Sequence, residues 1–266
     1  MTDDASRFVG SIPELYDRCL GPRLFEGYAD DLATRVAKHN PARLLELAAG
    51  TGILTQRLRA MLPDQCEIVA TDLNEPMLEI AKQKISGSKP ISFEQADGTE
   101  LPFADASFDV VACQFGVMFF PDKHRSYTEV VRVLRPGGVY LFNAWDSWQA
   151  NPCAAIANSV IEAMFPEDTP GFYKVPFHYH DVDEIQRDVS AAGFARVEVE
   201  RVSITSEIPS ATDFARGLVF GNPLNEEIAG RGGDPQAAAD AIAKALDETL
   251  GNEMPLSALI VEAVKA

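Results

Sequence analysis

Several short segments in the first half of the chain place acidic or polar side chains directly after apolar runs. The first is "RLLELAAGTGILTQRL" (43–58), where Glu46 precedes a turn of small residues that includes Gly50 and Gly52. Glycines let a backbone approach a ligand closely, and the first N–H groups of a following helix face whatever binds there. The segment therefore suits a nucleotide-binding turn, although an ordinary strand-to-helix connection has the same appearance.

Glu46 indicates which nucleotide suits this turn. A carboxylate four residues before Gly50 would repel a pyrophosphate by on the order of several kcal/mol if it were poorly screened. A dinucleotide-binding turn has the pattern G-x-G-x-x-G, but Gly50 and Gly52 are followed by Thr55 where the third glycine is required. A nucleoside that carries a cationic amine and no phosphate fits better, and S-adenosylmethionine has that form.

Two further acids have spacings that suit the same ligand. Asp72 ends the run "CEIVATD", and a carboxylate there can accept hydrogen bonds from both hydroxyls of a ribose. Asp97 and Gly98 end "ISFEQAD", where the carboxylate can accept from an adenine amino group. Met77 would form a polarizable wall near the adenine. The alternatives are a helix-capping acid at Asp72, a solvated Asp-Gly turn and a core methionine.

The alternation of β-rich runs with helical patterns predicts the frame that positions these residues. Strands are expected at 43–48, 66–72, 91–97, 108–114 and 138–145, with helices near 52–61, 75–86 and 122–134. Such an order implies a mostly parallel sheet with helices on both faces. Because ligands bind outside the carboxyl ends of parallel strands, Glu46, Asp72, Asp97 and Gln114 are expected to lie close together.

The pattern changes after Trp145. Residues 148–165 and 210–252 look helical and loop-rich, whereas 195–204 and 257–266 alternate like strands. The helical pattern "GDPQAAADAIAKALDETL" has an apolar face and an acidic face, so it is expected to be a solvated helix of a cap inserted between two strands.

Composition narrows the class of protein. The chain has 266 residues, 46% hydrophobic and 24% charged, which is enough for one large domain or a domain with a cap. The net charge of −17 disfavours nucleic acid and anionic membrane surfaces as partners. The four cysteines lack C-x-x-C spacing and "MTDDASRF" lacks a secretory pattern, which together predict a cytoplasmic protein. The apolar run "VVACQFGVMFF" is too short to span a membrane.

The order of four motifs resembles the class I S-adenosylmethionine-dependent methyltransferases, particularly the small-molecule group that includes ubiquinone and menaquinone biosynthesis enzymes. The motifs are "ELAAGTG", "ATDLNEPML", "QADGTELPFADASFDVV" and "RVLRPGGVYLFNAW", and the resemblance covers about residues 40–146. Ala48 departs from the glycine that this family often has.

This resemblance implies a Rossmann-like, doubly wound α/β fold with a seven-stranded, mostly parallel sheet of order 3-2-1-4-5-7-6. The last strand is antiparallel, and a helical cap at 206–254 precedes it. Lid helices would occupy 1–40 and the cofactor-binding core 41–146. The implied cofactor is S-adenosyl-L-methionine, and the implied contacts are Glu46, Ala48, Ala49, Gly50, Thr51, Gly52, Asp72, Leu73, Met77, Asp97, Gly98, Gln114 and Phe115. Tyr16, Phe25 and Tyr28 would close over the donor, and Trp145 would line the acceptor pocket.

The expected reaction is an in-line displacement at the sulfonium methyl by an oxygen, nitrogen or carbon atom of a small molecule. Proximity and alignment contribute up to about 7–11 kcal/mol in well-oriented reactions, so a general base is not required. His124, His178 and His180 are weak candidates for one, and no catalytic residue or metal ligand is assigned. The alternatives are a non-catalytic S-adenosylmethionine-binding protein and a nicotinamide-dependent oxidoreductase. The acceptor and the oligomeric state stay open.

Overall fold

The computed structural model describes residues 7, 8, 10, 12–85 and 91–266. They contain a seven-stranded sheet of order β3-β2-β1-β4-β5-β7-β6, as predicted. The strands are β1 (Arg43–Leu47), β2 (Glu67–Asp72), β3 (Ile91–Gln95), β4 (Phe108–Gln114), β5 (Leu134–Trp145), β6 (Phe194–Glu207) and β7 (Glu253–Lys265). The first five pair in parallel, and β7 pairs antiparallel with both β5 and β6.

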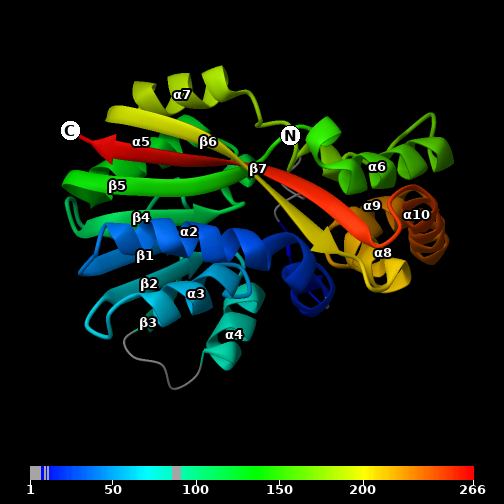
Figure 1. Cartoon of the computed structure of the whole chain (residues 1–266), viewed down its shortest axis with the longest axis horizontal. Helices are drawn as coiled ribbons and strands as arrows, with labels where there is room; N and C mark the ends of the chain where they lie inside the picture. Colours follow the sequence, from blue (N-terminus) through cyan, green and yellow to red (C-terminus); the bar gives the residue numbers. More distant parts are fainter. Residues whose placement is uncertain (1–6, 9, 11, 86–90) are drawn as a thin grey trace.

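Helices connect the parallel strands in the expected order. They are α3 (Ile53–Met61), α4 (Glu75–Lys84) and α5 (Lys123–Val133), while α7 (Val182–Ala191) leads into β6. The sheet order reverses between β1 and β4, so right-handed crossovers place α3 and α4 on one face of the sheet and α5 on the other. Figure 1 shows α3 in front of the strands beside α2. Because both faces are covered, β1 and β4 are almost continuously buried.

Several boundaries differ from those predicted. β5 begins at Leu134 rather than 138 and runs through "RPGG", with a register shift opposite β4 between Phe108 and Val110. Gly137, at φ +73°, gives this irregular segment its left-handed residue. β6 and β7 are also longer than predicted because they pair with each other as far as Glu207 and Glu253.

The N-terminal part of the chain is helical from Ile12. A short α1 (Ile12–Leu15) leads into η2 (Tyr16–Phe25), a π-helix, and then into α2 (Glu26–Lys38), which packs on α3. Glu26 N–H donates to the carbonyl of Gly21, five residues back, as a π-helix requires. Residues 1–6, 9 and 11 of the predicted lid region lie outside the described residues, and a lid role for this region stays a prediction.

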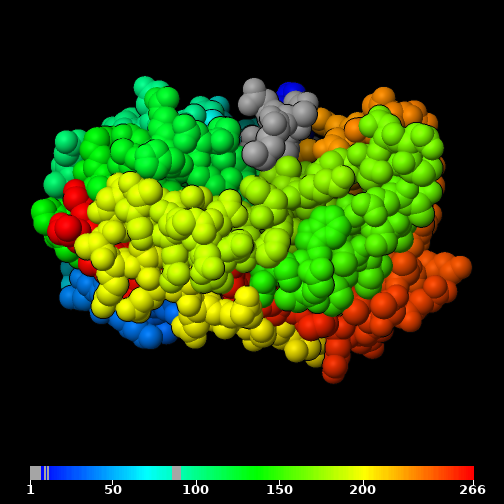
Figure 2. Space-filling model, turned by 90° about the horizontal axis from the view of Figure 1, so that it is seen from above, coloured from blue at the N-terminus to red at the C-terminus, as the bar shows by residue number. Residues whose placement is uncertain are grey.

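A group of helices lies beyond one end of the sheet. It comprises α6 (Pro152–Met164), α8 (Ala211–Phe220), α9 (Leu224–Gly230) and α10 (Pro235–Thr249). The last three fall inside the predicted cap at 206–254, and α10 packs on both α8 and α6. Figure 2 shows the yellow-green residues after β5 lying against the orange helices of this group. The helical group therefore also includes residues that precede β6.

The described residues also form three short 3-10 segments, η3 (Val117–Phe119), η4 (Trp148–Ala150) and η5 (Phe172–Lys174). A main hydrophobic core runs through the sheet and into the helical group. Among the described residues, no helix is both long enough and apolar enough to cross a membrane.

Candidate functional site

A cavity of about 310 Å³ lies where the carboxyl ends of the parallel strands face the helical group. Residues at four strand ends line it, as the sequence predicted for Asp72, Asp97 and Gln114. We call this part the strand-end half, which comprises Gly50, Asp72, Met77, Asp97, Gly98, Gln114 and Phe115. The opposite part, the cap half, comprises Trp145, Cys153, Phe172, Tyr173, Phe177, Leu218, Asn222 and Leu256.

Asp72 is held by the backbone around it. Its Oδ2 accepts the N–H of Gly50 at 2.9 Å, and its Oδ1 accepts the N–H of Asn74 at 2.8 Å. Burial raises the pKa of Asp72, and these hydrogen bonds act in the opposite direction. The carboxylate thus has a fixed orientation at the cavity wall.

Asp97 and Gly98 form the next part of the wall. Asp97 Oδ1 accepts both the N–H and the Oγ1 hydroxyl of Thr99 at 2.7 Å. Asp97 therefore stabilises its own turn and also lines the cavity. A Cβ added at Gly98 would lie 3.0 Å from the ring of Phe120, which also lines the cavity. Glycine therefore keeps this edge open.

The turn after β1 has an unusual backbone at Ala48. Its φ is +50°, a left-handed conformation that favours glycine over alanine. Opposite it, a Cβ added at Gly116 would lie only 2.5 Å from Ala48 Cβ. The Ala48 methyl therefore has room because residue 116 is a glycine.

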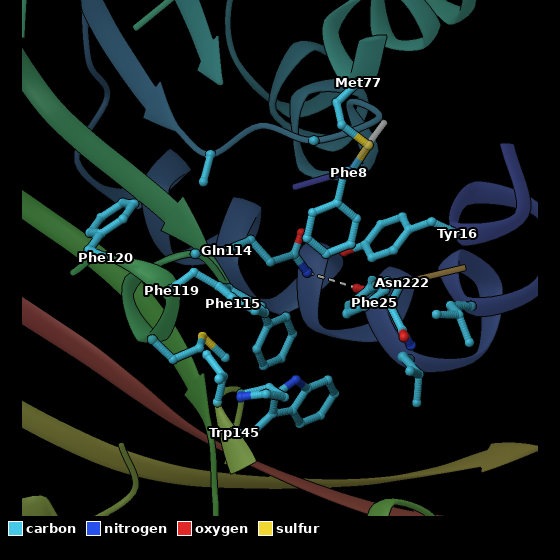
Figure 3. Close-up of a pocket in the computed structure, with 18 of the residues that line it drawn as sticks. Phe8, Tyr16, Phe25, Met77, Gln114, Phe115, Phe119, Phe120, Trp145 and Asn222 are labelled. Atoms are coloured by element: carbon cyan, nitrogen blue, oxygen red, sulfur yellow. Dashed lines mark hydrogen bonds between the residues drawn. The ribbon is translucent and has the colours of Figure 1, made fainter. Parts of the chain in front are cut away.

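Gln114 and Phe115 join the two halves of the cavity. Gln114 Nε2 donates to the carbonyl of Phe25 at 2.9 Å, which is the dashed line in Figure 3. Phe115 has φ +49°, and its N–H donates to Oδ1 of the fully buried Asn143 at 2.8 Å. The ring of Phe115 stacks on Trp145 with centroids 4.0 Å apart. Figure 3 shows Met77 at one end of the site and Trp145 at the other.

Glu46 lies outside the cavity lining. Its side chain is only 1% exposed, and neither carboxylate oxygen has a hydrogen bond of standard geometry among the described residues. Burial raises the pKa of Glu46 to about 8, the neighbouring Thr55 lowers it, and Asp72 raises it further. The Glu46 carbonyl accepts the Thr71 hydroxyl at 2.8 Å, and Thr71 does line the cavity. Glu46 is therefore one residue removed from the cavity.

The other predicted turn residues divide into two groups. Ala48 and Gly50 line the cavity, whereas Ala49, Thr51 and Gly52 do not. The Thr51 hydroxyl instead donates to Asp17 of η2 at 2.6 Å. A Cβ at Gly52 would lie 2.9 Å from Ala81 Cβ, so this glycine permits close contact with α4.

The predicted covering residues also divide. Tyr16 and Phe25 line the cavity and stack with centroids 4.9 Å apart. Leu73, predicted as a cofactor contact, also lines it and is half exposed. Tyr28 is fully buried behind the wall, where its hydroxyl donates to the carbonyl of Val202 at 3.2 Å. Tyr28 contacts Phe115 and Trp145 ring to ring, so it supports the wall from behind.

Sequence reasoning missed most of the cap half. Apart from the predicted Trp145 of β5, its residues come from α6, η5 and the loop after it, α8 with its following turn, and β7. They are chiefly aromatic or aliphatic and sit in segments whose apolar spacing looks like ordinary core. Tyr173, whose hydroxyl donates to the carbonyl of Leu218 at 2.7 Å, carries no sequence pattern that marks a site.

The three candidate histidines lie outside the cavity lining. His124 is exposed on α5, and the Nδ1 atoms of His178 and His180 contact the carbonyls of Val175 and Phe177. Within the described part of the chain, no group of three or more His, Cys, Asp or Glu side chains could hold a metal ion.

Comparisons with known proteins agree with this architecture. Residues 45–142 match the family model described as a methyltransferase domain. A demethylmenaquinone methyltransferase from Deinococcus radiodurans is 40% identical over 127 residues, which is 47% of this chain and 52% of the relative. A ubiquinone/menaquinone biosynthesis C-methyltransferase, UbiE, from Idiomarina loihiensis is 33% identical over 123 residues, 45% of this chain and 47% of the relative. The chain thus spans about half the length of these curated relatives.

Solved structures share the fold over most of the chain. The YcgJ protein from Bacillus subtilis has a TM-score of 0.61 at 20% identity, covering 90% of this chain and 98% of that one. Phosphoethanolamine N-methyltransferase 2 from Haemonchus contortus, solved with S-adenosylhomocysteine, has a TM-score of 0.57 at 17% identity, covering 97% and 60%. The predicted resemblance to class I S-adenosylmethionine-dependent methyltransferases is thereby confirmed.

Proposed function

We propose that this chain, which has the class I methyltransferase fold and a methyltransferase domain at residues 45–142, transfers a methyl group from S-adenosylmethionine to a small molecule. The observation that carries the proposal is the cavity itself. Its strand-end half presents Asp72, Asp97 and Gln114 from successive strand ends, and its cap half is a mainly apolar chamber that continues from it. Such a two-part cavity suits a nucleoside donor beside a small acceptor.

The charges of the cavity fit this cofactor better than a dinucleotide. Asp72 and Asp97 line it, and no Lys, Arg or His does among the described residues. A pyrophosphate would therefore be buried against carboxylates without a cationic partner, which is unfavourable. A ligand with an ammonium and a sulfonium would instead place its positive charges near these carboxylates, which is favourable.

The residue roles in this proposal follow the geometry. Asp72, with its fixed carboxylate, would bind the ribose hydroxyls, and Asp97 the adenine amino group. Met77 would pack on the adenine, and Gly98 would leave space at its edge. Gln114 and Phe115 would lie at the methionine end, close to Trp145 and the acceptor.

The chain's own contribution to the reaction would be positioning and exclusion of water. When bound, S-adenosylmethionine supplies a methyl group activated by its sulfonium. Tyr16 and Phe25 cover the cavity from η2, and the stacked rings of Phe115 and Trp145 restrict the junction between its halves. Holding the acceptor in line at this junction is the kind of contribution that lowers a displacement barrier most.

We place the protein in the cytoplasm, with a small-molecule acceptor and no nucleic-acid partner. The four cysteines are unpaired in the structure, and three of them are buried, as in a reducing compartment. The excess of 40 acidic over 23 basic residues disfavours contact with phosphate backbones. The segments 1–40 and 206–254 would act as lid and cap around the core.

Calorimetric titration of the purified chain with S-adenosylhomocysteine, beside the reduced nicotinamide cofactors, tests this proposal. We expect micromolar binding of S-adenosylhomocysteine alone. Preference for a nicotinamide, or no binding of either, would contradict it. Binding without turnover on any acceptor would favour a non-catalytic S-adenosylmethionine-binding protein.

A further inference from the structure

The cap half offers no positive charge to an acceptor. No Lys, Arg or His is among the described residues that line the cavity. Lys123 does not line the cavity, and its Nζ donates to the carbonyls of two residues that do, Met118 and Phe120, at 3.4 and 3.3 Å. A carboxylate, phosphate or oxyanion buried in this chamber would therefore lack a counter-charge, which is strongly unfavourable.

The cap half also offers no group able to take a proton at neutral pH. Its titratable side chains are Tyr173 and Cys153, and Tyr16 lines the same cavity from η2. Burial raises the pKa of both tyrosines, and it raises the pKa of Cys153 to about 12. Asp72 and Asp97 belong to the strand-end half, where backbone or turn groups already donate to them. An acceptor must therefore attack without losing a proton to the protein first.

The walls of the junction suit a cation. Phe115 and Trp145 stack there, and Phe25 lies 5.7 and 6.2 Å from them between ring centroids. Aromatic faces attract ammonium groups, most strongly where water is excluded. A positive charge formed at this junction would be stabilised without any ionised partner.

The cap half also lies outside the part of the chain that matches the methyltransferase domain. That match ends at residue 142, and Trp145 and every cap-half residue follow it. The acceptors of the relatives therefore do not determine the acceptor here, and the chamber itself must be considered.

We infer that the acceptor is a primary or secondary amine whose remaining part is apolar and about the size of an aromatic ring system. This inference rests on the proposed function. The free amine attacks with its nitrogen lone pair, so that a C–N bond forms while the C–S bond breaks and its electron pair goes to sulfur. The positive charge moves from sulfur to nitrogen, and the cavity holds the same net charge before and after. The methylated product leaves as an ammonium ion, because the proton was lost to water when the free amine formed before the attack.

Three probes of matched shape test this inference: 2-(1-naphthyl)ethylamine, 2-(1-naphthyl)ethanol and 1-naphthylacetic acid. With S-adenosylmethionine present, we expect methylation of the amine to exceed that of the alcohol by about a hundredfold. The acid should not react. The rate with the amine should rise with pH as the free amine becomes more abundant. Mass spectrometry of the products gives the methylated atom.

Binding provides a second readout that does not depend on turnover. In a Trp148→Phe protein saturated with S-adenosylhomocysteine, Trp145 is the only tryptophan and lies in the cavity wall. Its fluorescence should report binding of the amine at least about tenfold tighter than that of the acid. Equal binding of the acid, or preferential methylation of the alcohol, would overturn the inference. Failure to bind S-adenosylhomocysteine at all would instead contradict the proposed function.

A charge-reversal variant sharpens the test. Leu24 lines the cavity from η2 and is only partly buried, so Leu24→Lys can place an ammonium at the cavity while its stem stays in apolar contact. This variant should gain about tenfold in affinity for 1-naphthylacetic acid and lose affinity for the amine. The matched control is Met164→Lys, at a residue of α6 that is 37% exposed and does not line the cavity. This control should change neither the affinity for the acid nor the affinity for the amine. An unchanged preference in Leu24→Lys, with S-adenosylhomocysteine binding retained, would contradict an electrostatic origin of the selectivity.

Discussion

Asp72 Oδ2 accepts the backbone N–H of Gly50 at 2.9 Å, which ties the end of β2 to the turn after β1. The same carboxylate faces the cavity. Binding and local structure therefore depend on one side chain. Substitutions at Asp72 should therefore change both ligand affinity and stability.

Asp72→Ala should weaken binding of S-adenosylhomocysteine by about tenfold or more, because a charge-assisted hydrogen-bond acceptor is lost. It should also lower the free energy of unfolding by about 1–3 kcal/mol, since the Gly50 N–H loses its acceptor. Calorimetry and urea unfolding separate the two effects. Asp247→Ala, an equal charge change on the exposed side of α10, is the control. Unchanged affinity in folded Asp72→Ala would remove Asp72 from the ribose site.

The buried Glu46 makes stability depend on pH. Its pKa is about 8 in the folded chain and near 4.5 when unfolded, so the folded state binds more protons between these values. The free energy of unfolding should therefore fall as pH rises from about 5 to 9. In Glu46→Gln this contribution should vanish, so the variant should be the more stable protein at pH 9 by a few kcal/mol. Thermal unfolding across this range, beside Glu162→Gln at an exposed position of α6, measures the difference.

Ligand binding should release a proton from Glu46. An ammonium placed near the turn lowers the pKa of a neighbouring carboxyl, so S-adenosylhomocysteine binding at pH 7 should deprotonate it in part. Calorimetry in two buffers with different ionisation enthalpies detects the released proton. Glu46→Gln should show no release and bind more weakly. If the binding enthalpy of the wild-type protein is the same in both buffers, no proton is released. Glu46 would then support the turn without responding to the ligand.

Ala48 and Gly116 should be energetically coupled. Gly116→Ala introduces a Cβ 2.5 Å from Ala48 Cβ and 2.7 Å from Cys113 Sγ, and should destabilise the fold by about 1–3 kcal/mol. Adding Ala48→Gly removes the first of these contacts and should restore part of the loss. The contact with Cys113 should keep the recovery incomplete. Additive effects in this double-mutant cycle would show that the two residues do not share space.

Asn143 should control the junction of the two halves. Asn143→Ala leaves the buried N–H of Phe115 without its acceptor, which should cost about 1–3 kcal/mol of stability. It should also disturb the stacking of Phe115 on Trp145. In a Trp148→Phe background, the near-UV circular dichroism of Trp145 reports that change. An unaltered spectrum would show that the stacking persists without the hydrogen bond.

The sequence predicted the sheet and the strand-end half well for a physical reason. The parallel strands β1, β2 and β4 are short, mostly apolar runs that are largely buried, and Asp72 and Gln114 are polar residues at the points where two of these runs stop. The edge strand β3, which precedes Asp97, is only partly buried and alternates in sequence. The π-helix η2 was not predicted, because its i→i−5 hydrogen bonds leave no distinct pattern of residue types. The cap half was missed since Phe177, Leu218 and similar residues look the same whether they fill a core or line a chamber. The position of Glu46 behind Thr71 likewise depends on backbone geometry at the turn.

Apart from Trp145 of β5, the chamber is assembled from side chains on α6, on η5 and the loop after it, on α8 with its following turn, and on β7, and none of these elements contributes Asp72, Asp97 or Gln114. A library restricted to Phe177, Leu218 and Leu256 would therefore diversify what the protein accepts while leaving the strand-end half intact. Each member could first be screened for retained S-adenosylhomocysteine binding and only then for altered selectivity. In engineering terms, this fold separates the positions to randomise from those to preserve.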